Sequence, residues 1–292
     1  MQTLLKSKTG QVKITTEGAI AIIGESINPT RRKKLTAALL SGEMDYIFEL
    51  AKSQIDTGAD VLDINVGAPG VDEVTMLPKV AMAVSEQFNV PLCLDSSNRD
   101  ALAAALRVVP GKPLINSVNG EEASLAKLLP LIKDFGAAVI ALTMDDDGIP
   151  TDVGKRTKIA GKILERAAQL GIPLEDVVID PLVLTVGADQ KAGQVTLTTI
   201  QMVRKEFGVN INLGASNVSF GLPDRHTVNQ AFLALGAGAG ASCVITNPEK
   251  LTPIIRAADL LLGRDAFAGR FIKDFRKRQT LGLVSDGAAA KA

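Results

Sequence analysis

The chain has 292 residues, a length that suits one large α/β barrel better than two small domains. Hydrophobic residues make up 46% of it, which is enough for an extensive core and argues against disorder. Lys and Arg together number 32, as do Asp and Glu, so the charge balance gives no reason to expect nucleic acid or an acidic membrane surface as a partner. With no Trp and one Tyr, platforms for base stacking are scarce as well.

Cysteine usage points to a reducing compartment. Cys93 and Cys243 each lie inside an apolar run, as small core residues do. Zinc and iron–sulfur sites need clustered Cys or His, and the chain has one His, so we expect no protein-bound metal. Residues 1–10 lack the apolar stretch of a signal peptide, and no apolar run predicts a membrane span. We therefore expect a cytoplasmic protein.

Eight short apolar runs have the length and composition of strands. In chain order they cover residues 19–24, 60–65, 91–95, 113–117, 137–143, 176–180, 210–215 and 241–246. They do not alternate with polar residues, which is typical of strands buried on both faces of a parallel sheet. Segments with helical period lie between them, for example Val74, Leu77, Ala81 and Val84.

This alternation is the (β/α)₈ pattern, so we predict an α/β fold of the TIM-barrel class. An open doubly wound sheet is the alternative, but residues 24–28 after the first strand hold one Gly and no phosphate-binding loop. We assign residues 1–292 to a single domain, with the barrel at about 19–265. Residues 1–18 are an extension, expected as a hairpin that closes the barrel bottom, and residues 266–292 are a last helix and a disordered tail.

Carboxylates and amides stand where five of these strands end. The acids are Asp63, Asp95 and Asp180, and the amides are Asn65, Asn98, Asn116, Asn119 and Asn217. Burying such groups without partners costs free energy, and in a barrel the usual partner is a ligand at the carboxyl ends of the strands. A flat heterocycle such as a pterin suits them, because one carboxylate can accept from both its ring N–H and its NH₂ group while amides serve the remaining ring atoms.

Seven segments together resemble a known family. They are residues 23–28 (IGESIN), 63–67 (DINVG), 92–98 (LCLDSSN), 115–117 (INS), 142–144 (LTM), 179–182 (IDPL) and 216–219 (SNVS). Their order and spacing are similar to those of the pterin-binding methyltransferases that act between methyltetrahydrofolate and a corrinoid protein. The resemblance is closest to the enzymes that serve corrinoid/iron–sulfur proteins and demethylase systems, and it covers about residues 20–265.

The resemblance implies a TIM barrel that is usually a homodimer. It implies transfer of a methyl group between N5 of tetrahydrofolate and the cobalt of cobalamin. No corrinoid or homocysteine segment accompanies the barrel in this sequence, so we expect the corrinoid on a separate partner protein. The direction of transfer stays open.

Individual positions match the family's site. The residues that hold its pterin match Asp63, Asp95, Asn116 and Asp180. Asn217 matches the amide that contacts N5 and is the candidate catalytic residue, because it can stabilise the changing charge on N5 without titrating. Asn119 and Arg225 lie beside these segments and are assigned to the same pocket. The expected chemistry is mainly the positioning of two reactants in line.

Two other functions remain as alternatives. Dihydropteroate synthase resembles this barrel and binds a related pterin, but it needs a Lys after the seventh strand and an Arg-x-His near the last. Residues 216–218 (SNV) and 242–246 (SCVIT) supply neither. A non-catalytic pterin-binding subunit is the second alternative, and a methyl-transfer assay separates it from the enzyme.

Three further features have weaker functional interpretations. The basic run at residues 31–34 (RRKK) is a solvated helix start, or it attracts the folate glutamate tail or an acidic patch on a corrinoid protein. Residues 145–147 (DDD) mark a turn rather than a metal site. His226 is placed at a helix start, where Asp224 can act as the cap.

Overall fold

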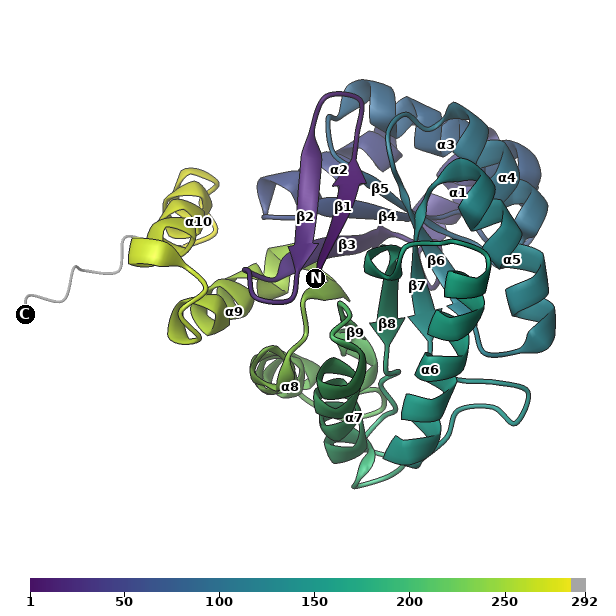
Figure 1. The fold of residues 1–292 in the computed structure, drawn as a ribbon. Coiled ribbons are helices and arrows are strands. Elements are labelled where there is room, and N and C mark those ends of the chain that lie inside the picture. Colours follow the sequence, from purple (N-terminus) through teal and green to yellow (C-terminus); the bar gives the residue numbers. More distant parts are fainter. Residues whose placement is uncertain (285–292) are drawn as a thin grey trace, which may run out of the picture.

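Eight parallel strands form the barrel wall in this computed structural model (Figure 1). They are β3 Ala21–Ile27, β4 Val61–Asn65, β5 Leu92–Asp95, β6 Leu114–Asn119, β7 Ala138–Leu142, β8 Val177–Asp180, β9 Asn212–Gly214 and β10 Cys243–Thr246. Neighbours follow the order β8-β7-β6-β5-β4-β3-β10-β9, and a parallel bridge between Ile179 and Ile211 joins β8 to β9 and closes the ring. The predicted (β/α)₈ fold is confirmed. The structure describes residues 1–284, so the tail expected to be disordered lies outside the described residues.

Helices follow each strand and cover the outside of the ring. They are α1 Lys33–Ser41, α2 Asp45–Asp56, α3 Glu73–Gln87, α4 Arg99–Val108, α5 Glu122–Phe135, α6 Val153–Gln169, α7 Ala192–Phe207, α8 Arg225–Ala239 and α9 Pro248–Leu261. Short 3₁₀ turns lie at η1 Leu174–Asp176, η2 Ala215–Asn217 and η3 Ala266–Ala268. Side-chain caps start several helices, and the cap predicted at Asp224 is confirmed, since its carboxylate accepts from the Thr227 N–H.

Two apolar layers hold the barrel together. The larger layer lies between the outer face of the strands and the helices, and it includes Leu62, Leu77 and Val84. The smaller layer fills the barrel interior and includes both cysteines, which are fully buried free thiols as predicted. Because side chains alternate along a strand, the interior residues recur at every second position.

A hairpin closes the lower end of the interior. It consists of β1 Gln2–Lys6 and β2 Gln11–Thr15, paired antiparallel. Leu5 and Ile14 are fully buried against the inner layer. Asn210 ties the hairpin to the barrel, because its side-chain amide donates to Ile14 O and to Thr3 Oγ1, both at 2.9 Å.

The same alternation places polar side chains above the apolar layer. Val61 belongs to that layer, and Asp63 follows two residues later on the same side of β4. Cys93 is followed in the same way by Asp95, and Leu114 by Asn116. The paired register of the strands brings Asp95 beside Asn116. The barrel therefore has a closed apolar floor and a polar upper end.

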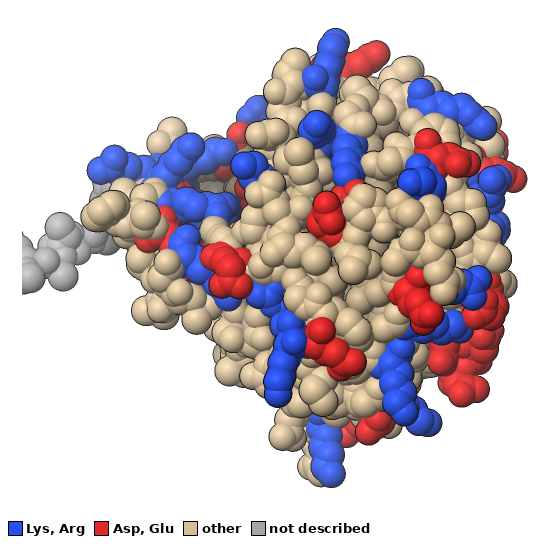
Figure 2. All heavy atoms as spheres, in the orientation of Figure 1, with Lys and Arg blue, Asp and Glu red and all other residues tan. Residues whose placement is uncertain are grey.

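A last helix, α10 Gly269–Thr280, projects from the barrel beside α9 (Figure 1). Figure 2 shows basic side chains gathered over this helix, whereas charges of both signs are mixed over the rest of the visible face. Within residues 1–284, no helix is long and apolar enough to cross a membrane.

Replacing Asn210 should separate the hairpin from the barrel floor. In Asn210→Ala, the buried Ile14 carbonyl loses its amide donor, and we expect the free energy of unfolding to fall by about 2 kcal/mol. Urea unfolding followed by circular dichroism measures this change. Asn89→Ala is the matched control, because the exposed Asn89 side chain contacts Ser7 and Thr9 of the same hairpin. Equal losses in the two variants would contradict a special role for the buried amide.

Candidate functional site

A cleft of about 300 Å³ opens at the carboxyl ends of β3 to β6. Its lining residues are Glu25, Asn28, Thr30, Arg32, Asp63, Asp95, Asn116 and Ile245. We call it the central cleft. Three of the sequence-predicted pterin residues, Asp63, Asp95 and Asn116, thus face one cavity, and its volume lies at the lower end of the range for small-molecule sites.

Asp63 is almost fully buried in the wall of the central cleft. The Asn116 amide approaches one of its carboxylate oxygens at 3.4 Å. Burial, and then the nearby charge of Asp95, raise the pKa of Asp63 to about 8. Asp63 therefore holds a proton near neutral pH, which lets it lie beside a second carboxylate.

Asp95 is oriented by its neighbour on β4. The Asn65 Nδ2 donates to Asp95 Oδ2 at 2.9 Å, while Asn65 Oδ1 accepts the Gly67 N–H at 2.8 Å. Burial raises the pKa of Asp95; the hydrogen bond from Asn65 lowers it, and the charge of Glu73 raises it. One carboxylate oxygen is thus fixed by the protein, and the other is left for a ligand in the cleft.

Glu25 stands at the junction of two clefts. It lines the central cleft and also a second cleft of about 300 Å³, the side cleft, whose other residues are Ser216, Arg225, His226, Asn229, Asn247, Lys250 and Leu251. Burial raises the pKa of Glu25, against the hydrogen bond from Ser216 at 3.2 Å and the charges of Arg32 and Arg225. Glu25 therefore adds a third acid to the site.

The direction of Glu25 depends on an irregularity in β3. The pairing of β3 with β4 shifts register between Gly24 and Ile27. There, the Ser26 N–H donates to Gln54 Oε1 at 2.7 Å. A Cβ on Gly24 would lie 2.4 Å from this Gln54 oxygen, so any larger residue there would displace the glutamine from this contact. The glutamine thus secures the strand where Glu25 turns into the barrel.

Asp180 lies to the side of the central cleft and is held by the protein itself. Its two carboxylate oxygens accept from the Asn212 amide at 2.6 Å and the Leu182 N–H at 2.8 Å. Burial raises its pKa to about 6, and these two hydrogen bonds and the charge of Arg156 oppose that rise. Asp180 is not among the residues that line either cleft. Its predicted contact with the pterin stays a prediction.

The buried Arg156 fixes the loop that follows Asp180. Its guanidinium donates to the carbonyls of Pro150, Pro181 and Leu182 at 2.7 to 2.8 Å. These contacts join the loops after β7 and β8.

Two of the predicted amides are placed differently from the acids. Asn119 uses its side-chain oxygen to accept the Glu121 N–H at 3.1 Å, which is a local turn contact. Asn217 is exposed in η2, and within the described part of the chain its side chain has no hydrogen-bond partner. Neither residue lines the central or the side cleft. Asn217 is thus free to meet a ligand from the rim.

Arg225 lines the side cleft and is fixed by two contacts. Its guanidinium donates to Ser216 O at 2.6 Å and to Ser219 Oγ at 3.1 Å. His226, the next residue of α8, is exposed and contacts Gln230 at 2.9 Å, as a residue in the first turn of a helix can. Arg225 and Ser216 therefore bring the loop after β9 against Glu25.

The acidic run after β7 forms the predicted turn. Asp145 and Gly148 exchange backbone hydrogen bonds, and the Asp147 N–H donates to Asp145 Oδ1 at 3.1 Å. Among residues 1–284, no group of three or more His, Cys, Asp or Glu side chains is placed to hold a metal ion.

Sequence reasoning missed Glu25 and Asn212 as site residues, and it listed Asn65 among the strand-end amides without assigning it a role in the pocket. Glu25 directly follows an apolar run and Asn212 lies within one, but the local sequence did not distinguish either from the residues beside it. The signal that finds them is the period of two counted from the inner apolar layer, which selects Glu25 after Ile23. Asn212 could be found only through its partner Asp180.

Comparisons with known proteins identify the family of this chain. The model of the pterin-binding enzyme family matches residues 24–247. The methylcorrinoid:tetrahydrofolate methyltransferase of Eubacterium limosum is 30% identical over 264 residues, which are 88% of this chain and 96% of that protein. Methionine synthase of Mycobacterium tuberculosis is 29% identical over 94% of this chain, which corresponds to 24% of that longer protein.

Solved structures share the fold at lower identity. Dihydropteroate synthase of Vibrio fischeri is 17% identical, with a TM-score of 0.70 over 90% of this chain and 99% of that chain. The dihydropteroate synthase of Yersinia pestis is 15% identical, with a TM-score of 0.67 over 90% of this chain and the whole of that one. These two likenesses concern the barrel alone. The family model and the sequence relatives show that the chain belongs to the pterin-binding enzymes and is a methyltransferase.

Proposed function

We propose that this enzyme moves a methyl group between N5 of tetrahydrofolate and the cobalt of a corrinoid carried by a separate protein. The observation that carries the proposal is the central cleft, where Asp63, Asp95 and Asn116 face one cavity of pterin size. The relative from Eubacterium limosum, named for a methylcorrinoid and tetrahydrofolate, supports both substrates and the direction toward folate. A homodimer and a cytoplasmic location belong to the same proposal.

The central cleft supplies acceptors for the donors of a pterin. Asp95 has one oxygen fixed by Asn65 and one free, so it can accept from the ring N–H or the NH₂ group without turning. Asp63 holds a proton in the free protein. A pterin donor beside it would stabilise the ionised carboxylate and favour loss of that proton. Asn116 can both donate to and accept from the remaining ring atoms.

Methyl transfer toward folate begins with N5 attacking the methyl carbon. The carbon–cobalt bond breaks, its electron pair stays on cobalt, and N5 becomes positively charged until it loses its proton. Asn217 is proposed to accept a hydrogen bond from N5 with its side-chain oxygen, which stabilises this charge. Its exposure at the rim suits a residue that must act where two proteins meet, and its lack of a protein partner leaves the amide available.

Dihydropteroate synthase remains the second candidate on fold alone. Ser216 and Asn217 stand after β9 where that enzyme needs a Lys. No contact in the site favours this chemistry.

Removing the charge of Asp95 should weaken folate binding. In Asp95→Asn, a neutral amide replaces the carboxylate that accepts from the pterin, and we expect tetrahydrofolate to bind about a hundredfold more weakly. Isothermal titration calorimetry measures the affinity. Asp100→Asn is the control, since Asp100 is exposed in the first turn of α4. Wild-type affinity in folded Asp95→Asn would remove this residue from the pterin site.

Folate affinity should rise with pH up to about 8. The pKa of Asp63 in the free protein is about 8, and a pterin donor lowers it by favouring the ionised form, so binding releases a proton and weakens as the pH falls. Titrations between about pH 6 and about pH 8.5, from roughly two units below this pKa to roughly half a unit above it, in buffers of different ionisation enthalpy count the protons released. Asp63→Asn should flatten the profile, whereas Asp176→Asn at the barrel floor should not. An unchanged slope in Asp63→Asn would contradict the assignment.

Asn217→Ala should slow methyl transfer much more than it weakens binding. Loss of a hydrogen bond that strengthens as charge develops typically costs roughly 10²–10³ in rate, while ground-state affinity should stay within about tenfold. Single-turnover transfer between methylcobalamin and tetrahydrofolate measures the rate, and wild-type protein must support it. Failure of the wild type would overturn the proposed function, whereas a wild-type rate in Asn217→Ala would make this residue part of the rim only.

A further inference from the structure

The proposed methyl transfer releases a proton from N5, and Asn217 cannot remove it. When N5 of tetrahydrofolate takes the methyl group, the nitrogen carries both a hydrogen and a positive charge. Asn217 can hold this N–H, but an amide side chain does not take up a proton at neutral pH. A carboxylate close to Asn217 can, because proton transfer needs an acceptor within hydrogen-bond reach or one water away.

Glu25 lies where that proton is released. Of the three acids that line the central cleft, it is the one that also lines the side cleft, where Ser216 stands beside it. The Ser216 hydroxyl lies 3.2 and 3.4 Å from the two Glu25 carboxylate oxygens and has one proton to donate. Ser216 and Asn217 are consecutive residues of η2. Glu25 thus reaches from the pterin cavity to the turn that carries the amide proposed to meet N5.

The other two acids of the central cleft are less suited to this task. Asp95 accepts from Asn65 with one oxygen and offers the other to the pterin. Asp63 is almost fully buried in the cleft wall and does not line the side cleft. Glu25 is only partly buried, so a proton that it receives has a shorter way to solvent.

The charges around Glu25 keep both of its protonation states accessible. Burial raises its pKa, while the hydrogen bond from Ser216 and the charges of Arg32 and Arg225 oppose that rise. An acid–base group works best when its pKa lies near the working pH, which such opposing influences favour. The titratable and charged groups that line the two clefts around it are Asp63, Asp95, Arg32, Arg225, His226 and Lys250.

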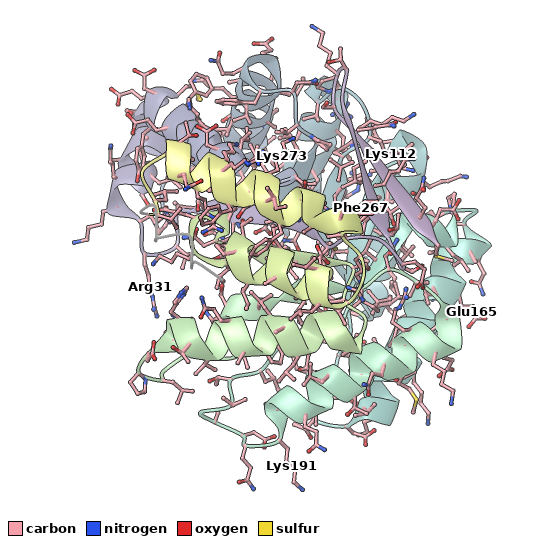
Figure 3. The ribbon with its side chains drawn as sticks, turned by 90° about the vertical axis from the view of Figure 1, so that its left-hand side faces the viewer. Arg31, Lys112, Glu165, Lys191, Phe267 and Lys273 are labelled. Carbon is pink, nitrogen blue, oxygen red and sulfur yellow. The ribbon has the colours of Figure 1, made fainter. Side chains whose placement is uncertain are left out.

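The side cleft connects Glu25 to the outer rim of the barrel. His226, which lines it, is exposed. Arg31 and Arg225 approach the ring centre of Phe220 at 5.4 and 5.8 Å, so the starts of α1 and α8 meet at this rim. Figure 3 shows Arg31 on the opposite side of the molecule from Lys112 and the hairpin. The rim therefore lies away from the closed floor, and a proton can leave Glu25 toward it.

We propose that Glu25 is the catalytic residue that exchanges a proton with N5. The inference rests on the proposed function, because it requires the folate in the central cleft. In transfer toward folate, N5 forms a bond to the methyl carbon, the carbon–cobalt bond leaves its electron pair on cobalt, and the N5 proton passes to the Glu25 carboxylate. In the reverse transfer, the protonated acid returns this proton to N5 as the bond between N5 and the methyl carbon breaks.

Single-turnover transfer from methylcobalamin to tetrahydrofolate, at saturating folate, tests this role. In Glu25→Gln, an amide of nearly the same shape keeps the contact with Ser216 but takes up no proton, and the rate should fall by roughly 10²–10⁴. The wild-type rate should rise with pH as Glu25 ionises, and the residual rate of the variant should not follow this rise. Glu249→Gln is the matched control, because Glu249 is exposed in the first turn of α9 and lines neither cleft.

Glu25→Ala supplies a second, independent measurement. The shortened side chain leaves room for a small carboxylate, so added formate should raise the transfer rate of this variant several-fold. Formate should not raise the rate of Asn217→Ala, because that variant keeps Glu25. A side chain that serves only the structure of the site gives slow transfer without such rescue.

The outcomes separate this inference from the function on which it rests. If the wild type transfers and Glu25→Gln matches its rate at saturating folate, Glu25 at most helps to hold the substrate, and the inference is overturned. It is also overturned if Glu25→Gln is slow but keeps the wild-type pH dependence, or if formate does not rescue Glu25→Ala. If the wild type itself transfers no methyl group, the proposed function fails.

Discussion

The burial of several carboxylates in the upper end of the barrel is the constraint on which the rest of the site depends. Asp63, Asp95 and Asp180 all leave water, so each charged form is disfavoured unless something compensates it. The protein compensates them with amides. Asn116, Asn65 and Asn212 each donate one hydrogen bond to one acid. An amide stabilises a carboxylate without neutralising it, and the acid keeps capacity to accept from a ligand. A permanent cation in the same place would satisfy the acid and compete with the pterin.

Arg156 and Arg225 lie just outside this layer, whereas Arg32 lines the central cleft itself. Arg156 directs its donors to the carbonyls of Pro181 and Leu182 and influences Asp180 only through its charge. Arg225 holds the backbone of Ser216, which in turn contacts Glu25. These two guanidinium groups thus fix loops of the rim, while Asp63, Asp95 and Asp180 accept from neutral amides. Rigid support with an incompletely satisfied interior is what a preorganised binding site requires.

The fold could be predicted from the sequence because its main signal is local. Each barrel strand is buried on both faces, and therefore appears as a continuous apolar run that ends in a polar residue. All eight predicted runs are strands, although β3 extends to Ile27 and β9 shrinks to residues 212–214. The extension matters, because it carries Glu25 inside a strand rather than in a loop. The cause is the contact between Gln54 and Ser26, which no pattern within residues 19–28 reveals.

The site could be predicted only in part, for a related reason. Strand ends show which residues reach the upper face, and this places Asp63, Asp95 and Asn116 together. Strand ends do not show which carboxylate oxygen already accepts a hydrogen bond from the protein. Asp180 has both oxygens occupied by contacts from Asn212 on β9 and from the Leu182 backbone. Asn119 turns its oxygen to its own loop. Such competition between the protein and a ligand for the same acceptor is a property of three-dimensional neighbours.

The contrast between Asp180 and Asn217 suggests how binding and reaction are divided across the barrel. Asp180 is buried and held on both oxygens, so a ligand can reach it only by replacing a protein donor. Asn217 is exposed and unheld within the described chain, so it can adjust when a second reactant approaches. A methyl group passed between two large molecules must be reached from outside, and the acids that hold the pterin must stay shielded from water. Deep, amide-supported carboxylates with an exposed polar group at the rim satisfy both conditions within one barrel end.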